Sequence, residues 1–344
     1  MAQNKAAWIK TSGAHPLAID DSPIPRPGPG ELVIKNAVVA INPVDWKIQD
    51  HGRYLNKYPF ILGEDAAGTV EAVGEGVVGF QKDQRVIAHC HALMTRDPSS
   101  SAFQNYTLVT EKLTSALPDS LSFAEGAVLP LAISTASAGL FQKDTLNLPL
   151  PSATDKIETD NKDTILIWGG TSSVGATAIQ LAVAAGLKVI TTTSSQNKDF
   201  VKSIGAQTAI DYKSPNVVDE VANALRGSQI AGVFDAISET RSFETVQKIL
   251  ESLDVFPKVA SVLPYDKPTE NFSPKYVTAF TIIQEPNQYV GEAVWKKFVP
   301  EGLANGKLQA KPEPYVVGHG LEDLQKALDI QRKGVSAKKV VVTL

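Results

Sequence analysis

The chain has 344 residues, 43% of them hydrophobic and 20% charged, and a formal net charge of −4. This composition excludes a chain that is disordered throughout, and the length predicts two domains because one core rarely grows beyond about 250–300 residues. The negative charge and the absence of a Lys/Arg cluster argue against nucleic acid as a partner. No apolar run reaches the roughly 18 residues that span a bilayer, and no basic segment with an apolar h-region opens the chain, so no membrane partner is expected.

The single cysteine, Cys90, excludes a disulfide within the chain and a cysteine-rich metal site. We expect Cys90 to be a small, partly buried residue. The cysteine content suits a reducing compartment, which predicts a cytoplasmic location.

The first 125 or so residues are predicted to be rich in strands. Pro and Gly punctuate them at short intervals between residues 23 and 30. Short apolar runs follow at Leu32–Ile41 and Thr69–Val73, with little helical periodicity. Regular short strands with turn signals indicate a barrel or a sandwich.

The pattern changes after Ser122. Phe123–Phe141 is rich in Ala and Leu, and Ser122 with Glu125 three residues later has the form of a capping box, which predicts one helix over this stretch. The polar, proline-containing segment Lys143–Asp163 is predicted to be an exposed loop.

From Thr164 onward strands and helices alternate, which is typical of βαβ units on a parallel sheet. The predicted strands are Thr164–Trp168, Lys188–Thr193, Thr208–Asp211, Gly232–Ile237, Lys258–Leu263 and Thr278–Ile283; the predicted helices are Ala176–Ala185, Lys198–Ile204, Val217–Leu225 and Phe243–Leu253. The tail is predicted to form helices at Val294–Gly302 and Leu321–Arg332 and a strand at Lys339–Leu344. The fold class is therefore α/β, with a doubly wound Rossmann domain built on a parallel sheet.

A glycine-rich turn at Gly169–Gly175 stands between a predicted strand and a predicted helix, the setting that makes a dinucleotide fingerprint credible. Gly170 would allow a tight turn, and Gly175 would allow close packing of helix on strand. The free N–H groups of the new helix would face a pyrophosphate. Ser172 replaces the middle glycine of the usual pattern, and a simple glycine-rich turn is the alternative interpretation. The predicted phosphate-binding residues are Gly170, Thr171, Ser172, Ser173 and Val174.

The second strand of this domain bears on the choice of cofactor. NAD enzymes usually carry Asp or Glu near its end to bind the ribose 2′-OH. Residues 190–198 hold hydroxyl groups and one lysine but no carboxylate, which fits a 2′-phosphate. The sequence therefore predicts NADPH as the cofactor, although Lys198 taken alone is as readily a solvated helix residue.

These residues resemble the medium-chain dehydrogenase/reductases, and within them the zinc-free quinone-oxidoreductase and enoyl-reductase branches. The resemblance spans essentially the whole chain. It is carried by Ile41–Lys47 (INPVDWK), by Leu62–Val70 (LGEDAAGTV) and by the glycine-rich turn. The segment Leu148–Pro151 is most similar to fungal trans-acting enoyl reductases that serve polyketide synthases.

The resemblance implies a GroES-like β-barrel domain over residues 1–124 and 290–344, with a Rossmann domain inserted at 125–289. In zinc-dependent relatives three metal ligands stand where this chain has Asn42, Glu64 and Leu131. Asn42 and Leu131 supply no thiolate, and a lone Glu64 makes no tetrahedral site, so no metal is expected.

The resemblance also implies residues that hold the cofactor. Lys198 and Tyr212 match the lysine and tyrosine that hold the 2′-phosphate in NADP-preferring relatives, and Ser194 lies on the matching loop. Thr135 matches a position near the nicotinamide. Asn42 and Pro43, in the first motif, are likewise predicted to contact the cofactor.

Without zinc, hydride transfer suits a carbon already polarised by conjugation, such as the β-carbon of an α,β-unsaturated carbonyl. The enolate that results needs a donor and then a proton. Lys47 is the predicted catalytic residue because its ammonium could steady an enolate or relay a proton. Solvent could also supply the proton. Asp45 is more readily structural, and the two histidines His89 and His91 are interpreted as surface or satisfied core residues.

Three functions remain open on the sequence. The first is an NADPH-dependent reductase of a small-molecule or carrier-bound enoyl substrate, with a polyketide synthase as a possible partner. The second is a quinone or aldehyde reductase, and the third a non-catalytic NADPH-binding protein. Either a monomer or a homodimer is compatible with the sequence, with a weak preference for the monomer.

Overall fold

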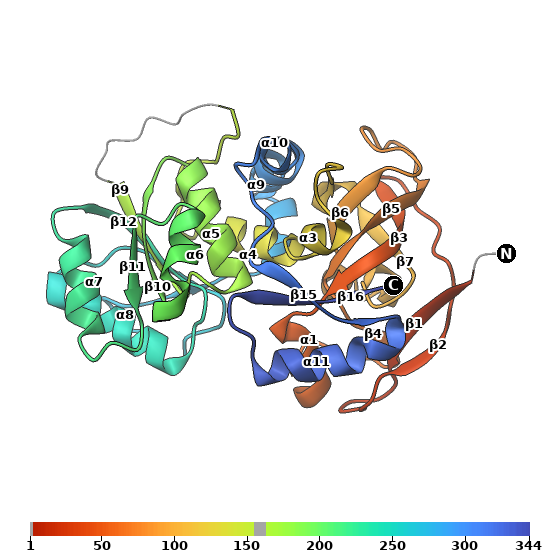
Figure 1. The fold of residues 1–344 in the computed structure, drawn as a ribbon, viewed down its shortest axis with the longest axis horizontal. Coiled ribbons are helices and arrows are strands. Elements are labelled where there is room, and N and C mark those ends of the chain that lie inside the picture. The colour runs from red at the N-terminus through yellow and green to blue at the C-terminus, as the bar shows by residue number, and fades with distance from the viewer. Residues whose placement is uncertain (1–2, 155–162) are drawn as a thin grey trace. The chain divides into compact units, whose positions relative to one another are not determined.

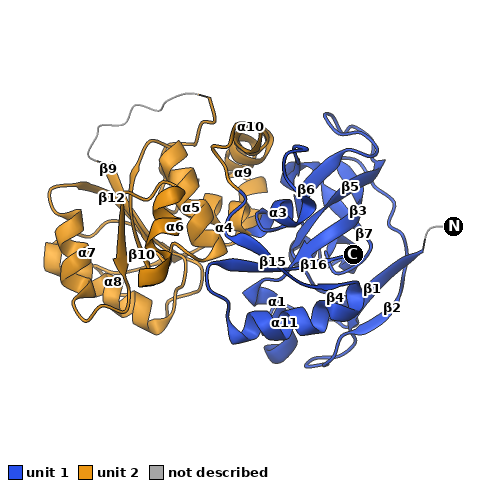
Figure 2. Ribbon diagram, in the orientation of Figure 1, with its two compact units in different colours: residues 1–131, 310–344 blue, residues 132–309 orange. Residues whose placement is uncertain are grey.

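The computed structural model describes residues 3–154 and 163–344, and the chain divides into two compact units (Figures 1 and 2). Unit 1 comprises residues 1–131 and 310–344, and unit 2 comprises residues 132–309. The expected boundaries at 124/125 and 289/290 therefore differ from the observed ones. The second difference has a local cause, since Gln309 and Gln180 of unit 2 exchange hydrogen bonds of 2.7 and 3.2 Å.

Unit 1 is rich in strands, as the sequence predicts. Its larger sheet runs in the order β15 (Glu313–His319), β16 (Lys338–Thr343), β3 (Glu31–Ala40), β5 (Asp65–Val73), β6 (Arg85–His89) and β8 (Thr114–Ala116), and β7 (Tyr106–Thr110) also pairs with β3. A smaller sheet has the order β2 (Ala18–Ser22), β1 (Asn4–Ile9) and β4 (Phe60–Ile61). The last strand of the chain thus lies in the interior of the larger sheet, between β15 and β3.

The predicted helix over Phe123–Phe141 is broken in two. Ser122 caps α3 (Phe123–Ala127) through its Oγ, which accepts from the Glu125 amide at 3.2 Å, while Glu125 accepts from the Ser122 amide at 2.8 Å. A second helix, α4 (Pro130–Phe141), begins at a proline, which is tolerated only in a first helical turn. The stretch has the length and composition of a membrane span, but 72% of its most apolar window is buried inside the protein, as in a core helix.

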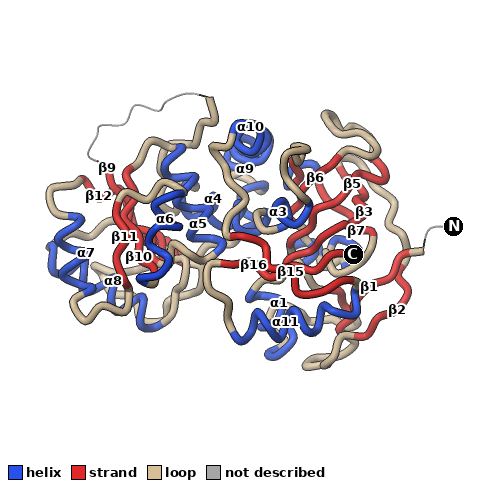
Figure 3. Tube along the Cα trace, in the orientation of Figure 1, coloured by secondary structure: helices blue, strands red, loops and turns tan. Residues whose placement is uncertain are grey.

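Unit 2 contains a six-stranded sheet whose paired strands are all parallel. The order is β11 (Thr208–Asp211), β10 (Lys188–Thr193), β9 (Asp163–Trp168), β12 (Gln229–Asp235), β13 (Val259–Ser261) and β14 (Lys275–Tyr276). This order confirms the doubly wound α/β class that the alternating pattern predicts. Figure 3 shows the contrast between this alternation and the strand-rich unit 1.

Helices cover both faces of this sheet. On one face α7 (Val217–Leu225) and α8 (Thr240–Leu253) share a buried cluster with Leu166 and Trp168 of β9. Side chains alternate along a strand, so Ile165 and Ile167 point to the opposite face. That face carries α5 (Ser173–Ala184) and α6 (Lys198–Ser203) (Figure 1).

Two predictions in unit 2 are wrong. Thr278–Ile283 is not a strand: residues Ala279–Ile283 form the 3-10 helix η4, and the last strand is the two-residue β14 before it. The described part of Lys143–Asp163 is not simply an exposed loop. Thr145, Leu146 and Leu148 are buried, and Leu146 packs against Gly232 of β12. Residues 155–162 of that loop lie outside the described residues.

The predicted helix at Val294–Gly302 is part of a longer helical stretch. It runs through α9 (Gln288–Gly291), the π-helical segment η5 (Glu292–Phe298) and α10 (Val299–Asn305). Trp295 is buried here, and its indole N–H donates to Ser134 Oγ of α4 at 3.0 Å.

Candidate active site

The glycine-rich turn joins β9 to α5 and has glycines at positions where a side chain would not fit. The left-handed conformation is at Gly169, with φ +82°, and not at Gly170 as the sequence suggested. Gly170 is needed for space, since a Cβ there would lie 2.2 Å from Thr191 Oγ1. A Cβ on Gly175 would lie 2.2 Å from the carbonyl oxygen of Gly169, so the predicted role of Gly175 in close packing is supported.

Ser172 explains why the usual middle glycine can be absent. It is the N-cap of α5, where its Oγ accepts from the Gly175 amide at 3.0 Å and donates to the Gly169 carbonyl at 2.9 Å. The serine therefore closes the turn with its own side chain and satisfies one of the free amides of the helix.

The start of α5 has the features of an anion site. Gly175 N is occupied by the cap, and the first amides of a helix have no partner within it, which leaves Ser173 and Val174 available. Thr171 to Val174 are partly exposed, whereas Gly169 and Gly170 beneath them are buried. The helix dipole adds to this preference for negative charge. The residues present thus fit the pyrophosphate of a dinucleotide.

The ends of β10 and β11 bring the predicted 2′-phosphate residues together. Thr193 and Asp211 are register partners at the ends of these parallel strands, so Ser194 and Tyr212 follow side by side. Lys198 begins α6 one turn after Ser194 and lies close enough to Asp211 to interact with its charge. Ser194, Lys198 and Tyr212 are all at least partly exposed.

One carboxylate at this edge was not weighed in the sequence analysis. Asp211 accepts from Ser195 Oγ at 2.5 Å and from the Lys213 amide at 2.9 Å. The hydroxyl of Ser195, together with that amide, holds the pKa of Asp211 below its usual value. Asp211 therefore holds the loop after β10 in place. It lies at the end of β11, whereas the acidic residue with which NAD enzymes bind the ribose lies at the end of the strand that corresponds to β10.

Helix α4 offers one narrow accessible stripe. Leu131 and Thr135 are partly exposed and stand one turn apart, whereas the residues between them are buried. Thr135 is next to Ser134, which the Trp295 indole holds at 3.0 Å. The predicted nicotinamide-side position of Thr135 therefore lies on a helix that is fixed from behind by a buried aromatic side chain.

In unit 1 the motif Asn42-Pro43-Val44-Asp45 begins helix α1 (Pro43–His51). Asp45 is buried, as expected for a structural carboxylate, and accepts from the Asn42 amide at 2.7 Å and from the Gly63 amide at 3.2 Å. Burial raises the pKa of Asp45 to about 7. Pro43 occupies the first helical position, where a missing N–H has no cost.

Asn42 is the N-cap residue of α1, and its side chain also reaches beyond the helix. With Asp45 at the third helical position it forms a capping box, in which the Asp45 carboxylate accepts from the Asn42 amide. Its Nδ2 donates to Asp65 Oδ2 at 2.7 Å, and its Oδ1 accepts from Lys339 Nζ. Lys339 also pairs with Asp65 Oδ2 at 2.9 Å, and Asp65 Oδ1 accepts from the Leu131 amide at 2.6 Å.

Glu64 stands beside this cluster and faces a histidine. Glu64 Oε2 lies 3.4 Å from His89 Nε2, and both side chains are buried. Burial, together with the nearby carboxylates of Asp45 and Asp65, raises the pKa of Glu64 well above its usual value. Burial lowers the pKa of His89 to about 3. Burial thus favours the neutral form of both the Glu64 carboxyl and the His89 imidazole.

The remaining candidates of unit 1 are core residues. Burial lowers the pKa of His91 to about 4 and raises that of the Cys90 thiol. His89 ends β6 and His91 precedes the short helix α2 (Ala92–Thr95), so the two do not share a strand face. Within residues 3–154 and 163–344, no three His, Cys, Asp or Glu side chains gather as metal ligands would.

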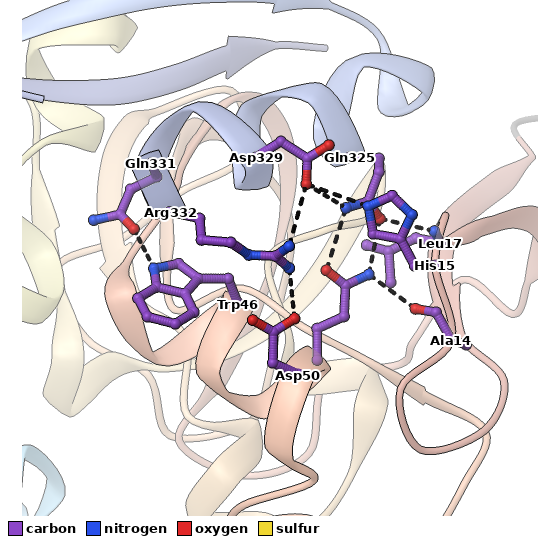
Figure 4. Close-up of polar contacts among 10 residues, drawn as sticks. Ala14, His15, Leu17, Trp46, Asp50, Gln325, Asp329, Gln331 and Arg332 are labelled. Atoms are coloured by element: carbon purple, nitrogen blue, oxygen red, sulfur yellow. Dashed lines mark hydrogen bonds and ion pairs between the residues drawn. The ribbon is translucent and has the colours of Figure 1, made fainter. Parts of the chain in front are cut away.

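Lys47 lies on α1, partly exposed, with its Nζ 5.6 Å from the centroid of the Trp46 ring. Helix α1 is held by α11 (Leu324–Lys333) through the polar contacts of Figure 4. Gln49 Nε2 donates to Gln325 Oε1 at 2.8 Å, Arg332 pairs with Asp50 at 2.5 Å, and Trp46 Nε1 donates to Gln331. The C-terminal helix thus holds the helix that carries Lys47.

Comparison with known proteins agrees with both units. Residues 28–119 match the family described as the alcohol dehydrogenase GroES-like domain, and residues 173–283 match the family described as zinc-binding dehydrogenase. The trans-enoyl reductase himH of Aspergillus japonicus is 41% identical, with 99% of this chain and 97% of that protein covered. This chain belongs to the medium-chain dehydrogenase/reductase superfamily.

Other medium-chain relatives carry related names. The dehydrogenase orsE of Emericella nidulans is 38% identical and the trans-enoyl reductase tndF of Aspergillus flavipes is 33% identical, each over the full length of both chains. Among solved structures, the CurK enoyl reductase has a TM-score of 0.74 at 19% identity, with 99% of each chain covered. The mycobacterial Rv1454c complexed with NADPH has a TM-score of 0.70 at 22% identity, with full coverage of both.

These likenesses establish a medium-chain oxidoreductase with a GroES-like domain and a Rossmann domain, from a family that binds nicotinamide cofactors. Within unit 2 the structure brings together Ser194, Lys198 and Tyr212. In unit 1 it places Asn42 and Pro43 at the start of α1 and Lys47 midway along that helix.

Lys339 is the residue that the sequence analysis missed. Its signal was a lysine opening an otherwise apolar final strand, and that pattern alone does not distinguish a buried lysine from a solvated one.

Proposed function

We propose that this protein is an NADPH-dependent, zinc-independent reductase of an activated C=C bond in an enoyl substrate. The observation that carries the proposal is the grouping of Ser194, Lys198 and Tyr212 at the ends of β10 and β11, with no carboxylate at the end of β10. Hydroxyl and ammonium donors suit a 2′-phosphate, which NADH lacks.

The cluster around Asn42 supports zinc independence. The Oδ1 of Asn42 accepts from the Lys339 ammonium, so the atom that would ligate a metal already binds a cation. A divalent ion at the same place would be repelled by that ammonium at close range. Glu64, at a second ligand position, faces His89 at 3.4 Å, and Leu131 at the third position has no ligand atom in its side chain.

The nicotinamide cofactor supplies a hydride, which suits the β-carbon of an α,β-unsaturated carbonyl. The chain's own residues would orient the cofactor and the substrate and supply a proton to the substrate. The Ser173 and Val174 amides would hold the pyrophosphate, and Thr135, Asn42 and Pro43 would line the nicotinamide end. Lys47 would steady the negative charge that develops on the carbonyl oxygen or deliver a proton to the α-carbon, and water is the alternative donor.

The names of the relatives himH and tndF support an enoyl substrate. We propose that the substrate is attached to the carrier of a polyketide synthase rather than free, that the reaction takes place in the cytoplasm, and that the protein acts as a monomer or a homodimer.

The cofactor assignment is tested by titrating the purified protein with NADPH and NADH. We expect Lys198→Ala to weaken NADPH binding roughly 10-fold or more, the value of one charge-assisted phosphate contact, and to leave NADH binding unchanged. Lys202→Ala is the matched control, because Lys202 lies on the same helix α6 and is exposed. Equal affinity of the wild type for the two cofactors would contradict the assignment.

The reaction is tested by following NADPH oxidation with acyl thioesters of α,β-unsaturated acids, small enones, quinones and aldehydes. Turnover of the thioesters and enones supports the proposal. Turnover of quinones or aldehydes alone identifies the other reductase class, and tight NADPH binding without turnover of any substrate points to a non-catalytic binding protein.

A further inference from the structure

Two neighbouring lysines on β16 have opposite surroundings. Lys338 is exposed, with its ammonium 5.2 Å from the centroid of the Tyr315 ring. Lys339 is only 4% exposed, and its ammonium is enclosed with Asn42 and Asp65. Burying a lysine is costly unless the ammonium is paired and hydrogen-bonded, so this position has a specific use.

The contacts of Lys339 and Asp65 distinguish the two ends of the Asn42 amide. The oxygen and nitrogen of an amide have nearly the same shape, and only their partners decide which way it points. An ammonium is a donor only and an ionised carboxylate an acceptor only. With Lys339 at Oδ1 and Asp65 at Nδ2, only one orientation satisfies both partners.

A competing position for this side chain is close by. Asn42 is the N-cap residue of α1, and its capping box with Asp45 sets its side-chain oxygen beside the first amides of the helix, which would donate to it. The Lys339 ammonium competes with those amides for Oδ1. The second hydrogen of Nδ2, beyond the one donated to Asp65, then has a fixed direction.

We propose that Lys339 is a positioning residue that, together with Asp65, sets the orientation of the Asn42 amide for contact with the nicotinamide end of the cofactor. The inference rests on the proposed function, in which Asn42 contacts the cofactor. It adds a residue 297 positions away in the sequence, on the last strand, that acts on the cofactor only through Asn42.

A double-mutant cycle tests this proposal in the full-length protein. The variants are Lys339→Met, Asn42→Ala and the double mutant, with Lys338→Met as a matched control that removes the neighbouring exposed lysine. The readouts are the Kd for NADPH and the thermal unfolding midpoint of each variant. We expect Lys339→Met and Asn42→Ala each to weaken NADPH binding about 10-fold, the effect of one lost hydrogen bond, and Lys338→Met to have no effect.

The decisive result is the Kd of the double mutant. If Lys339 acts through Asn42, the Lys339→Met change adds less than about threefold to the loss already caused by Asn42→Ala. Additive losses, or wild-type affinity in Lys339→Met, overturn the proposal. So does wild-type affinity in Asn42→Ala. Wild-type affinity in Asn42→Ala also removes the cofactor contact of Asn42 from the proposed function. The assignment as an NADPH-dependent enoyl reductase fails on other results, namely a wild type that does not prefer NADPH or that turns over no enoyl substrate.

Two further variants keep the test valid if Lys339→Met does not fold. Lys339→Arg keeps a side chain that only donates, and we expect NADPH affinity within about threefold of the wild type. Lys339→Gln fills the same space with an amide that both donates and accepts, so it no longer distinguishes the two ends of Asn42. We expect it to weaken binding about 10-fold. Wild-type affinity in Lys339→Gln contradicts the proposal.

Discussion

The two units build their candidate sites in different ways. In unit 2 the pyrophosphate end of the site is made of backbone: Gly169, Gly170 and Gly175 shape one turn, and the amides of the following helix are its binding groups. In unit 1 it is made of buried charged and polar side chains, with Asn42, Asp65 and Lys339 brought together from three separate segments. A backbone site depends on the absence of side chains, whereas a buried polar cluster depends on every partner being present.

This comparison predicts that an added side chain should reduce activity most when it is placed in the glycine-rich turn of unit 2. Gly175→Ala would place a Cβ 2.2 Å from the Gly169 carbonyl, so the turn must open. We expect kcat/KM with NADPH to fall about 100-fold, because a displacement of about 1 Å at a binding site has effects of this size. Steady-state kinetics with an enoyl thioester measure this.

Gly227→Ala is the control for that experiment. Gly227 has a positive φ of +76°, which Gly175 does not, and a Cβ there meets nothing within 4 Å. It should cost about 1–2 kcal/mol of stability from backbone strain and leave kcat/KM unchanged. Equal kinetic losses in the two variants would show that a general loss of stability, and not the lost close approach at Gly175, lowers kcat/KM.

In unit 1 the predicted sensitivity is to pH. Burial lowers the pKa of His91 to about 4 from an ordinary value of 6.5, so the contribution of this group to stability is complete above pH 6.5 and is lost as the pH falls toward 4. The difference in unfolding free energy between the wild type and His91→Asn should therefore shrink by about 1–3 kcal/mol from pH 7 to pH 4.

Denaturant unfolding at a series of pH values measures this difference. The raised pKa of Asp45 acts in the opposite direction over the same range, but it is common to both proteins and cancels. His51→Asn, which changes an exposed histidine at the end of α1, is the control. A difference that stays constant from pH 7 to pH 4 would show that His91 is not held neutral by burial.

The smallest predicted effect tests whether the Ser172 hydroxyl only caps α5 or also binds the cofactor phosphate. Ser172→Gly restores the usual glycine of the motif and removes the bonds from Ser172 Oγ to Gly175 and Gly169. Glycine is a fair N-cap, so we expect a loss of only a few tenths of a kcal/mol, against about 1 kcal/mol for Ser172→Ala. Thermal unfolding measures both. A large loss of NADPH affinity in Ser172→Gly would mean that the hydroxyl itself contacts the cofactor.

The sequence predicted the regular part of unit 2 well. Lys188–Thr193, Thr208–Asp211 and Val217–Leu225 have the bounds that their apolar patterns indicate. These elements follow local rules, with strand period, helix period and glycine stops all close together in the chain.

The errors have physical causes that the local pattern does not contain. Thr278–Ile283 is apolar enough for a strand but packs as a 3-10 helix, since helix and strand are ambiguous for short apolar runs. Leu146 and Leu148 belong to a segment read as exposed, and tertiary packing buries them. The role of Lys339 depends on partners 274 and 297 positions away, and no single-sequence pattern reports such a pairing.

The place of β16 in the larger sheet bears on the order of synthesis. It lies between β15 and β3, and it is translated after the whole of unit 2. Unit 2 is continuous in the chain and can fold as it emerges, because domains generally fold as units during translation. The first 131 residues must wait for their last partner strand. Until then Asp65 lacks its ammonium and β3 lacks its β16 partner, so we expect the first 131 residues to be the last part of the new chain to reach a stable fold.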